Sequence, residues 1–310
     1  MIPPVPAYIQ LFPTLRCNSS CGFCFNRGLS PTAQMELREF QRITDTISSL
    51  DISNLDILGG EPTIWPDLIP ALDHAVSARL RVSMSTNGSR VPVLKELSSR
   101  FSREALSIGI SINSAEISPD LHAYIMEQHP VIKTVSDRDS LVADAALQYL
   151  ELPELTYYLI YRDALSEAEL GDVMPFPHYL RRLKELQSVH ANVDGVHCGF
   201  IMDRENPLLK DVRCPAGVTK LSVMPDGSAY PCYLLARHGE FCLGNMLQDD
   251  FERIWRNPVL RFFREFRGNE CPSKSCGIYS YCHGGCPAIS LIIHGNIKAP
   301  DPRCIDKRGS

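Results

Sequence analysis

The distribution of the cysteines restricts the fold of this chain more than any other feature. There are 12 cysteines in 310 residues: three before residue 25, eight after residue 213, and Cys198 between the two sets. Disulfide frameworks are typical of small secreted chains. This chain is large, and its N-terminus, Met-Ile-Pro-Pro-Val-Pro, lacks the basic and apolar segments of a signal peptide. We therefore expect a cytoplasmic protein whose clustered thiols bind metal.

Charge and hydropathy argue against two classes of partner. The 31 basic and 36 acidic residues give a net charge of −5, which provides no positive field for a nucleic-acid backbone. No apolar run approaches the roughly 20 residues that cross a bilayer. We expect neither nucleic acid nor a membrane as a partner. The length allows one barrel-sized domain and a smaller module.

Strand-like and helix-like segments alternate over the first 200 residues. The segments 7–15, 55–58, 81–85, 106–112, 155–161 and 196–202 have the character of strands. Between them, helices are predicted near 40–50, 67–80, 93–100, 120–128, 139–150 and 178–188. Repeated βα units predict an α/β fold with a parallel sheet. After about residue 205, a hairpin around Pro225-Asp226-Gly227 and a helix over 251–266 precede a loop-rich, cysteine-rich end.

Polar motifs follow four of the predicted strands directly. They are the first cysteine triplet, Gly59-Gly60-Glu61, Thr86-Asn87-Gly88 and Ser111-Ile112-Asn113. Ligand-binding loops of parallel sheets gather at the carboxyl ends of the strands. The sequence therefore predicts a functional site at this edge.

The first triplet reads Cys17-Asn-Ser-Ser-Cys21-Gly-Phe23-Cys24. Three closely spaced thiolates can hold three irons of a cubane and leave the fourth iron open. A structural zinc site prefers four protein ligands. Zinc and inert thiols are the alternatives, and an iron–sulfur cluster is the favoured interpretation.

The triplet spacing, C-x3-C-x-aromatic-C with Phe23 as the aromatic, resembles the signature of the radical S-adenosylmethionine (SAM) superfamily. The resemblance covers nearly the whole chain and implies a partial (β/α)6 TIM-like barrel. It also implies that SAM chelates the open iron of a [4Fe–4S] cluster. An electron from a low-potential donor such as flavodoxin or ferredoxin then cleaves SAM, and the resulting radical takes a hydrogen atom from the substrate.

The same resemblance assigns further SAM contacts. Gly59, Gly60 and Glu61 resemble the motif for the SAM amino group, which implies that the glycines admit close backbone approach and that the Glu61 carboxylate pairs with the ammonium. Asn87 matches a position near the SAM ribose, and Ser111 begins a segment that is commonly Ser-Ile-Asp-Gly. Asn113 replaces the usual carboxylate there. Arg138 and Arg162 are further candidates for the SAM carboxylate.

The C-terminal cysteines resemble the SPASM extension of radical SAM enzymes that modify peptides and proteins. The pattern comprises Cys214, Gly227 and Cys232, then Cys271-x4-Cys276-x5-Cys282-x3-Cys286, then Cys304. One spacing departs from the family, which has two residues where this chain has four. The resemblance implies a first auxiliary [4Fe–4S] cluster on Cys214, Cys232 and Cys286, and a second on Cys271, Cys276, Cys282 and Cys304.

Some features of this C-terminal region stay open. The family's usual fourth ligand of the first auxiliary cluster falls on Leu208, so Cys198, Cys242 or an open position takes its place. A pair of zinc sites is the alternative for the whole set. We expect a radical SAM barrel over residues 1–205 and a SPASM-like domain over 206–310.

The favoured function is a maturase that abstracts hydrogen from a peptide or protein and forms a crosslink, an epimer or an oxidised residue. A dehydrogenase or epimerase of a small molecule such as an amino sugar is the alternative, and a non-catalytic iron–sulfur scaffold is a third class. Tyr233 stands where sulfatase-maturing relatives carry a catalytic Asp. It is a candidate catalytic relay, with packing as the alternative. Only 16 residues precede Cys17, so we expect leader recognition by a separate partner or by the core.

Overall fold

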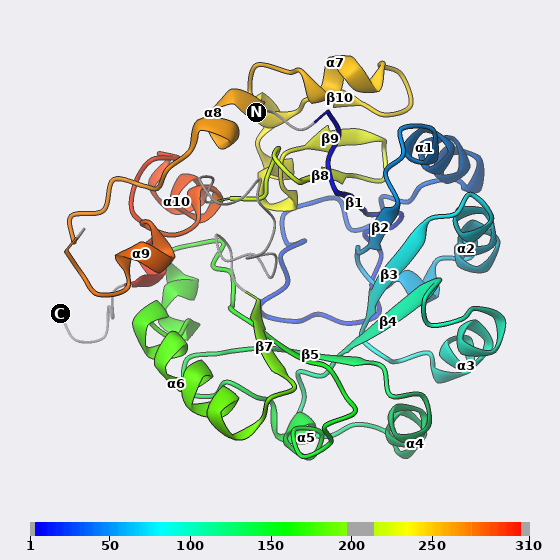
Figure 1. The fold of residues 1–310 in the computed structure, drawn as a ribbon, viewed down its shortest axis with the longest axis horizontal. Helices are drawn as coiled ribbons and strands as arrows, with labels where there is room; N and C mark the ends of the chain where they lie inside the picture. The colour runs from blue at the N-terminus through cyan, green and yellow to red at the C-terminus, as the bar shows by residue number, and fades with distance from the viewer. Residues whose placement is uncertain (1–3, 197–213, 274, 305–310) are drawn as a thin grey trace. The chain divides into compact units, whose positions relative to one another are not determined.

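The computed structural model describes residues 4–196, 214–273 and 275–304 (Figure 1). These residues form two compact units. The first unit contains the chain up to Ile110 together with Pro215–Glu265, and the second contains Ser111–Cys214 and the chain from Phe266 onward. Two residues considered for the first auxiliary cluster, Cys198 and Leu208, lie outside the described residues.

A mostly parallel sheet forms the centre of the first unit. Its strands lie in the order β10-β9-β8-β1-β2-β3-β4. Neighbours from β8 to β4 are parallel, and β9 and β10 are antiparallel additions. The bounds are β1 Tyr8–Leu11, β2 Asn54–Ile57, β3 Arg81–Thr86, β4 Leu106–Ser111, β8 Lys220–Val223, β9 Ser228–Tyr230 and β10 Gly244–Asn245.

Three helices connect these parallel strands and cover one side of β2, β3 and β4 (Figure 1). They are α1 (Leu37–Ser49), α2 (Leu68–Ser77) and α3 (Val91–Arg100). In α1, Phe40, Ile43 and Ile47 recur at helical spacing and are fully buried. Its start is fixed by a capping box between Glu36 and Glu39. No helix among the described residues is long and apolar enough to cross a bilayer.

The later part of the first unit confirms the predicted hairpin and corrects one helix. Strands β8 and β9 pair antiparallel around Gly227. Two 3-10 helices follow, η4 (Tyr233–Arg237) and η5 (Gly239–Phe241). The predicted helix over 251–266 is two helices, α7 (Phe251–Trp255) and α8 (Leu260–Glu265). The break falls at Asn257-Pro258, because a residue before proline disfavours helical geometry and the Asn257 side chain caps Val259 N–H at 3.0 Å.

The second unit holds three parallel strands in the order β5-β6-β7. Their bounds are β5 Val131–Val135, β6 Tyr157–Ile160 and β7 Val193–Val196. Helix α4 (Pro119–Gln128) precedes β5, α5 (Asp144–Leu147) connects β5 to β6, and η2 (Ala168–Asp172) and α6 (Phe176–Val189) connect β6 to β7. The cysteine-rich end contributes α9 (Tyr279–Cys282), α10 (Pro287–His294) and η6 (Pro302–Cys304).

Three predictions for this unit were wrong or incomplete. Strand β5 was not predicted, because its buried face carries the polar Thr134 and the alternation of apolar residues is therefore weak. The Thr134 hydroxyl is satisfied inside the protein by a hydrogen bond with the Tyr157 hydroxyl at 2.7 Å. The predicted helix over 139–150 shrinks to the four residues of α5. The predicted strand over 196–202 begins earlier, as β7, and its later part lies outside the described residues.

Candidate active site

The first cysteine triplet lies in the loop between β1 and α1 of the first unit. Cys17 is exposed, and Cys21 and Cys24 are half-buried. The Cys24 N–H donates to the Cys21 carbonyl at 3.1 Å, and the Ser19 N–H donates to Cys17 Sγ at 3.4 Å. Phe23, the aromatic residue of the motif, is half-buried. The thiols are therefore presented on a turned loop that leaves them accessible to a ligand.

The Gly-Gly turn after β2 holds the N-terminal flank of this loop. Gly60 N–H donates to the Thr14 carbonyl at 2.8 Å, and Glu61 N–H donates to the Arg16 carbonyl at 2.8 Å. A Cβ at Gly59 or Gly60 would overlap the carbonyl oxygen of Thr14 or Arg16, respectively. Gly59 also has φ +144°, which other residues rarely adopt. Both glycines are thus required for the turn to lie against the triplet loop.

The Glu61 carboxylate is buried, with 1% exposure, and already has four hydrogen bonds. Its Oε1 accepts from the Thr63 N–H at 3.0 Å and from the hydroxyls of Thr63 and Thr86 at 2.6 Å each. Its Oε2 accepts from the Asn87 N–H at 2.7 Å. Glu61 therefore fixes the ends of β2 and β3 to each other. Sequence reasoning did not identify this role, although threonines at both strand ends were visible.

Asn87 reaches the triplet loop directly. Its side-chain amide donates to Asn18 Oδ1 at 2.9 Å and to Ser19 Oγ at 3.2 Å. Asn18 in turn donates to Ser89 Oγ at 2.8 Å. The structure thus brings Gly59, Gly60, Glu61, Asn87 and the triplet together, as predicted from their positions after strands. Asn18 and Ser19 are contacts that the sequence analysis missed, and their polar character inside the cysteine motif was the available signal.

The three thiols fit the ligand set of a cluster with one open iron. Cys17 is exposed as a residue, but partial desolvation of its thiol raises the pKa of Cys17, and Glu61 and Cys24 add to the rise. Burial also raises the pKa of Cys21, with further contributions from Cys24 and Cys17. No three His, Cys, Asp or Glu side chains in the described part of the chain converge on a single ion. A cubane needs no such point, because each thiolate binds a different iron and loses its proton on binding.

Tyr233 lies in the first unit as the first residue of η4, directly after Cys232. Its ring packs 4.5 Å from that of Phe25 and 6.2 Å from that of Phe12, centroid to centroid. Cys232 itself is buried, with 7% exposure. Cys242 is half-buried and its Sγ donates to the Gly244 carbonyl at 3.7 Å.

Three candidate SAM residues, Ser111, Arg138 and Arg162, belong to the second unit. Arg138 is half-buried and donates through Nη1 to the Gly171 carbonyl at 3.5 Å. Ser111, the last residue of β4, is half-buried. Asn113 Oδ1 accepts from the Val135 N–H at 2.7 Å, so this amide anchors the end of β5. Ser136 Oγ and Arg162 Nε are buried without a hydrogen-bond partner among the described residues. These two groups, at the ends of β5 and β6, are available to a polar ligand, and Ser136 was not singled out from the sequence.

The C-terminal cysteines of the second unit gather their thiols in one region. Burial raises the pKa of Cys304 to about 12, and Cys282, Asp301, Cys271 and Cys276 add to the rise. Burial likewise raises the pKa of Cys282, with contributions from Cys276 and Cys271. The four residues expected to hold the second auxiliary cluster are therefore neighbours. Cys286 and Cys214 are buried in this unit, whereas Cys232 belongs to the other unit.

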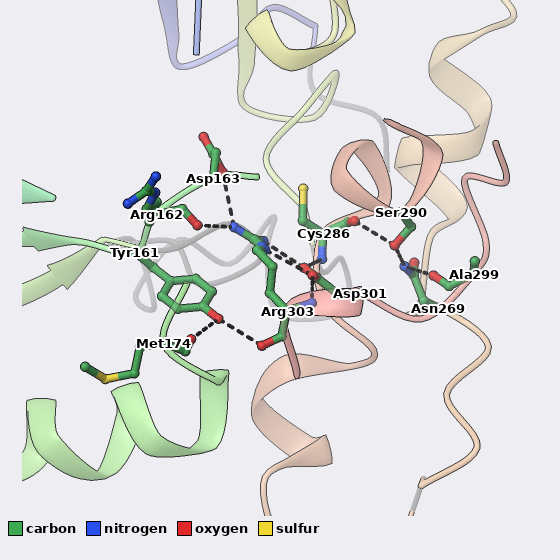
Figure 2. A network of polar contacts seen from close by, with 10 residues as sticks. All are labelled: Tyr161, Arg162, Asp163, Met174, Asn269, Cys286, Ser290, Ala299, Asp301 and Arg303. Carbon is green, nitrogen blue, oxygen red and sulfur yellow. Dashed lines mark hydrogen bonds and ion pairs between the residues drawn. The ribbon is translucent and has the colours of Figure 1, made fainter. Parts of the chain in front are cut away.

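A buried ionic network supports these cysteine loops (Figure 2). Arg303, with 4% exposure, donates through Nε to Asp301 Oδ1 at 3.0 Å and through Nη2 to Asp301 Oδ2 at 2.7 Å. Its Nη1 donates to the Arg162 carbonyl at 2.9 Å and to Asp163 Oδ1 at 3.2 Å. Asp301 Oδ2 also accepts from the Cys286 N–H at 2.9 Å. One guanidinium thus links the residues next to Cys304, the start of α10 and the end of β6.

Two family models and several known proteins match this chain. The model of the Radical SAM superfamily matches residues 11–132, and that of the SPASM iron–sulfur cluster-binding domain matches residues 214–287. Mycofactocin maturase MftC of Mycobacterium ulcerans is 24% identical over 96% of this chain and 87% of its own length. The antilisterial bacteriocin subtilosin biosynthesis protein AlbA of Bacillus subtilis is 23% identical, over 91% of this chain and 67% of its own length.

Solved structures share the fold. Streptococcus suis SuiB bound to precursor peptide SuiA has a TM-score of 0.74 and 18% identity, covering 98% of this chain and 76% of that one. The native anSMEcpe structure with bound AdoMet has a TM-score of 0.65 and 15% identity, covering 96% of this chain and 93% of that one. These matches confirm the predicted α/β class, a partial TIM-like barrel with a C-terminal iron–sulfur module.

Proposed function

Because the chain belongs to the radical SAM superfamily and carries a C-terminal SPASM domain, we propose that it is a maturase of a peptide substrate. It is a radical SAM enzyme, and its cofactors are SAM and [4Fe–4S] clusters. A peptide substrate is supported by two relatives, a mycofactocin maturase and a subtilosin biosynthesis protein, and by the structure of SuiB bound to a precursor peptide. The reaction forms a crosslink, an epimer or an oxidised residue.

The observation that carries this proposal is that hydrogen bonds connect the triplet loop to the Gly-Gly-Glu turn and to Asn87. In it, Cys17, Cys21 and Cys24 hold the SAM-binding cluster, and Phe23 shields its loop. Gly59, Gly60, Glu61, Asn87 and Ser111 contact SAM. When bound, the cluster and SAM together supply one-electron cleavage of SAM and hydrogen abstraction from the substrate.

The chain's own groups prepare this chemistry. The main-chain bonds of Gly60 and Glu61 orient the triplet loop, and the buried Glu61 carboxylate keeps the ends of β2 and β3 in register. Since Glu61 is occupied by Thr63, Thr86 and Asn87, we assign the contact with the SAM amino group to the backbone of this turn. Preformed polar groups of this kind avoid reorganisation when the ligand binds.

The auxiliary clusters are part of the same proposal. Cys271, Cys276, Cys282 and Cys304 hold one, and the mutual effect of their thiols on one another's pKa supports that grouping. Cys214, Cys232 and Cys286 hold the other, with Cys198, Cys242 or an open position as the fourth site. A low-potential donor such as flavodoxin or ferredoxin reduces the enzyme. Such oxygen-sensitive chemistry and free thiols suit the cytoplasm.

The test uses anaerobically reconstituted enzyme, dithionite and SAM. Short peptides encoded beside the gene are the first set of substrates, and amino sugars are the second. We expect a peptide to stimulate 5′-deoxyadenosine formation and to lose hydrogens, or to take up solvent deuterium at an epimerised centre, as measured by mass spectrometry. If an amino sugar stimulates 5′-deoxyadenosine formation and is converted while every peptide stays unmodified, the enzyme acts on a small molecule and is not a maturase.

A further inference from the structure

The helix η4 touches the triplet loop on its C-terminal side, within the first unit. Phe25 directly follows the ligand Cys24, and its ring packs against Tyr233, the first residue of η4, at 4.5 Å. Phe12 completes the cluster, at 6.0 Å from Phe25 and nearly perpendicular to it. Aromatic pairs at these separations stabilise each other beyond the effect of the area they bury.

Arg237, the last residue of η4, binds the same flank through the main chain. Its Nη2 donates to the Phe25 carbonyl at 2.6 Å and to the Arg27 carbonyl at 3.0 Å. Its Nη1 donates to the Leu234 carbonyl at 3.0 Å, within η4 itself. A guanidinium presents its donors in a fixed planar fork. Arg237 therefore fixes η4 and the residues after Cys24 relative to each other.

Tyr233 of η4 also contacts a residue of β8 that is hydrogen-bonded to β1. Lys220 Nζ lies 5.5 Å from the centroid of the Tyr233 ring. Lys220 is buried, with 8% exposure, and also donates to Gln10 Oε1 at 3.2 Å. Cys232 precedes η4, and its carbonyl accepts from the Leu235 N–H at 3.0 Å. A five-residue helix thus connects a predicted auxiliary-cluster ligand with the flank of the SAM-cluster loop.

We propose that Tyr233 and Arg237 are positioning residues that hold the Cys24 side of the triplet loop in the geometry that binds SAM. Tyr233 acts through its ring against Phe25, and Arg237 acts through the carbonyls of Phe25 and Arg27. This proposal rests on the proposed function only in that the triplet holds the SAM-binding cluster. It needs no peptide substrate. It also makes the loop sensitive to changes at Cys232, since η4 begins there.

The experiment compares conservative and disruptive variants of the full-length enzyme. Tyr233→Leu removes the ring contact with Phe25, whereas Tyr233→Phe keeps the ring. Arg237→Gln removes the guanidinium and its charge, whereas Arg237→Lys keeps the charge. Arg253→Gln is the matched control, because Arg253 pairs with Asp249 on the surface of the same unit at 2.6 Å. The first readout is the electron paramagnetic resonance spectrum of the reduced cluster before and after SAM is added. The second is the dissociation constant of SAM.

We expect Tyr233→Leu and Arg237→Gln to weaken SAM binding by roughly tenfold, as loss of about 1.4 kcal/mol implies, and to blunt the spectral change on SAM addition. Tyr233→Phe restores both readouts fully, Arg237→Lys restores them in part, and Arg253→Gln matches the unmodified enzyme. In the metal-free protein, Arg237→Gln accelerates alkylation of Cys24 several-fold. The exposed Cys276 serves as the internal reference, and we expect its alkylation rate to be unchanged.

Two results would overturn the proposal. Unchanged spectra, SAM affinity and Cys24 alkylation in both disruptive variants would show that η4 does not position the loop. SAM binding weakened as much in Tyr233→Phe as in Tyr233→Leu would show that the hydroxyl, and not the packing of the ring against Phe25, carries the effect. All the expected effects are measured with SAM alone, so a failed search for a peptide substrate leaves this test intact.

Discussion

The two cysteine sets are held in place by different forces. Cys17, Cys21 and Cys24 are exposed or half-buried, and the flanks of their loop are supported by main-chain hydrogen bonds, by the Arg237 guanidinium on two carbonyls and by aromatic contacts. In the C-terminal set, Cys282 and Cys286 are buried and Cys276 is exposed, and the Cys286 N–H donates to Asp301, which forms a buried ion pair with Arg303. A cluster that binds SAM, as proposed for the triplet, needs an open face, so its loop is supported from the sides. The C-terminal loops are instead tied to a buried ion pair.

The largest expected effect distinguishes the two sets by reaction. Cys24→Ala removes one of the three proposed ligands of the SAM-binding cluster, so 5′-deoxyadenosine formation should fall to the background of the protein-free reaction. Cys304→Ala should retain part of this formation but lose the modified product. Anaerobic assays with dithionite measure both. Full SAM cleavage by Cys24→Ala would show that the triplet does not hold the SAM-cleaving cluster.

The second prediction tests the ionic support of the C-terminal set. Arg303→Met leaves Asp301 and Asp163 without their buried partner. Breaking a buried pair in this way costs about 3–5 kcal/mol, so the urea midpoint should fall strongly. The control is Arg261→Met, because the pair of Arg261 with Glu265 is exposed on both sides and such pairs contribute less than about 1 kcal/mol. Equal shifts of the urea midpoint in the two variants would show that the Arg303 network stabilises the protein no more than an exposed ion pair does.

The third prediction concerns the Gly-Gly-Glu turn. Glu61→Ala leaves the Thr86 hydroxyl and the Asn87 N–H without their acceptor. An unsatisfied buried group costs about 1–3 kcal/mol, and the displaced turn should also weaken SAM binding. Denaturant unfolding and SAM titration measure the two effects, with exposed Glu96→Ala as the control in the same unit. If stability is unchanged while SAM binding is lost, Glu61 contacts SAM directly and our assignment to the backbone fails.

The smallest expected effect is at Asn113, where related sequences commonly carry Asp. Asn113→Asp keeps the oxygen that accepts the Val135 N–H, so stability should change by less than about 0.5 kcal/mol. Asn113→Leu removes the acceptor and should cost about 1 kcal/mol. Thermal and urea unfolding of both variants checks this. A large loss in Asn113→Asp would mean that the amide nitrogen, rather than the oxygen, is required.

Motif spacing predicted which residues come together at the candidate site but not the contacts that hold them there. Cys17, Gly59 and Asn87 were identified because each follows a predicted strand, and parallel strands bring their carboxyl ends to one edge. The bond from Arg237 to Phe25 joins residues that are 212 positions apart, and no local pattern marks such a pair. The burial of Arg303 was equally hidden, since an arginine before a cysteine has the same local sequence whether buried or exposed. Strand β5 escaped prediction because its buried Thr134 replaces an apolar residue.

The most direct test of this account is the iron and sulfide content of anaerobically reconstituted enzyme, measured together with 5′-deoxyadenosine formation from SAM and dithionite. Three cubanes predict about twelve irons and as many sulfides per chain, with SAM cleavage. About four irons with SAM cleavage would leave the triplet cluster in place and contradict the two auxiliary clusters. Full iron loading without any SAM cleavage would contradict the radical mechanism.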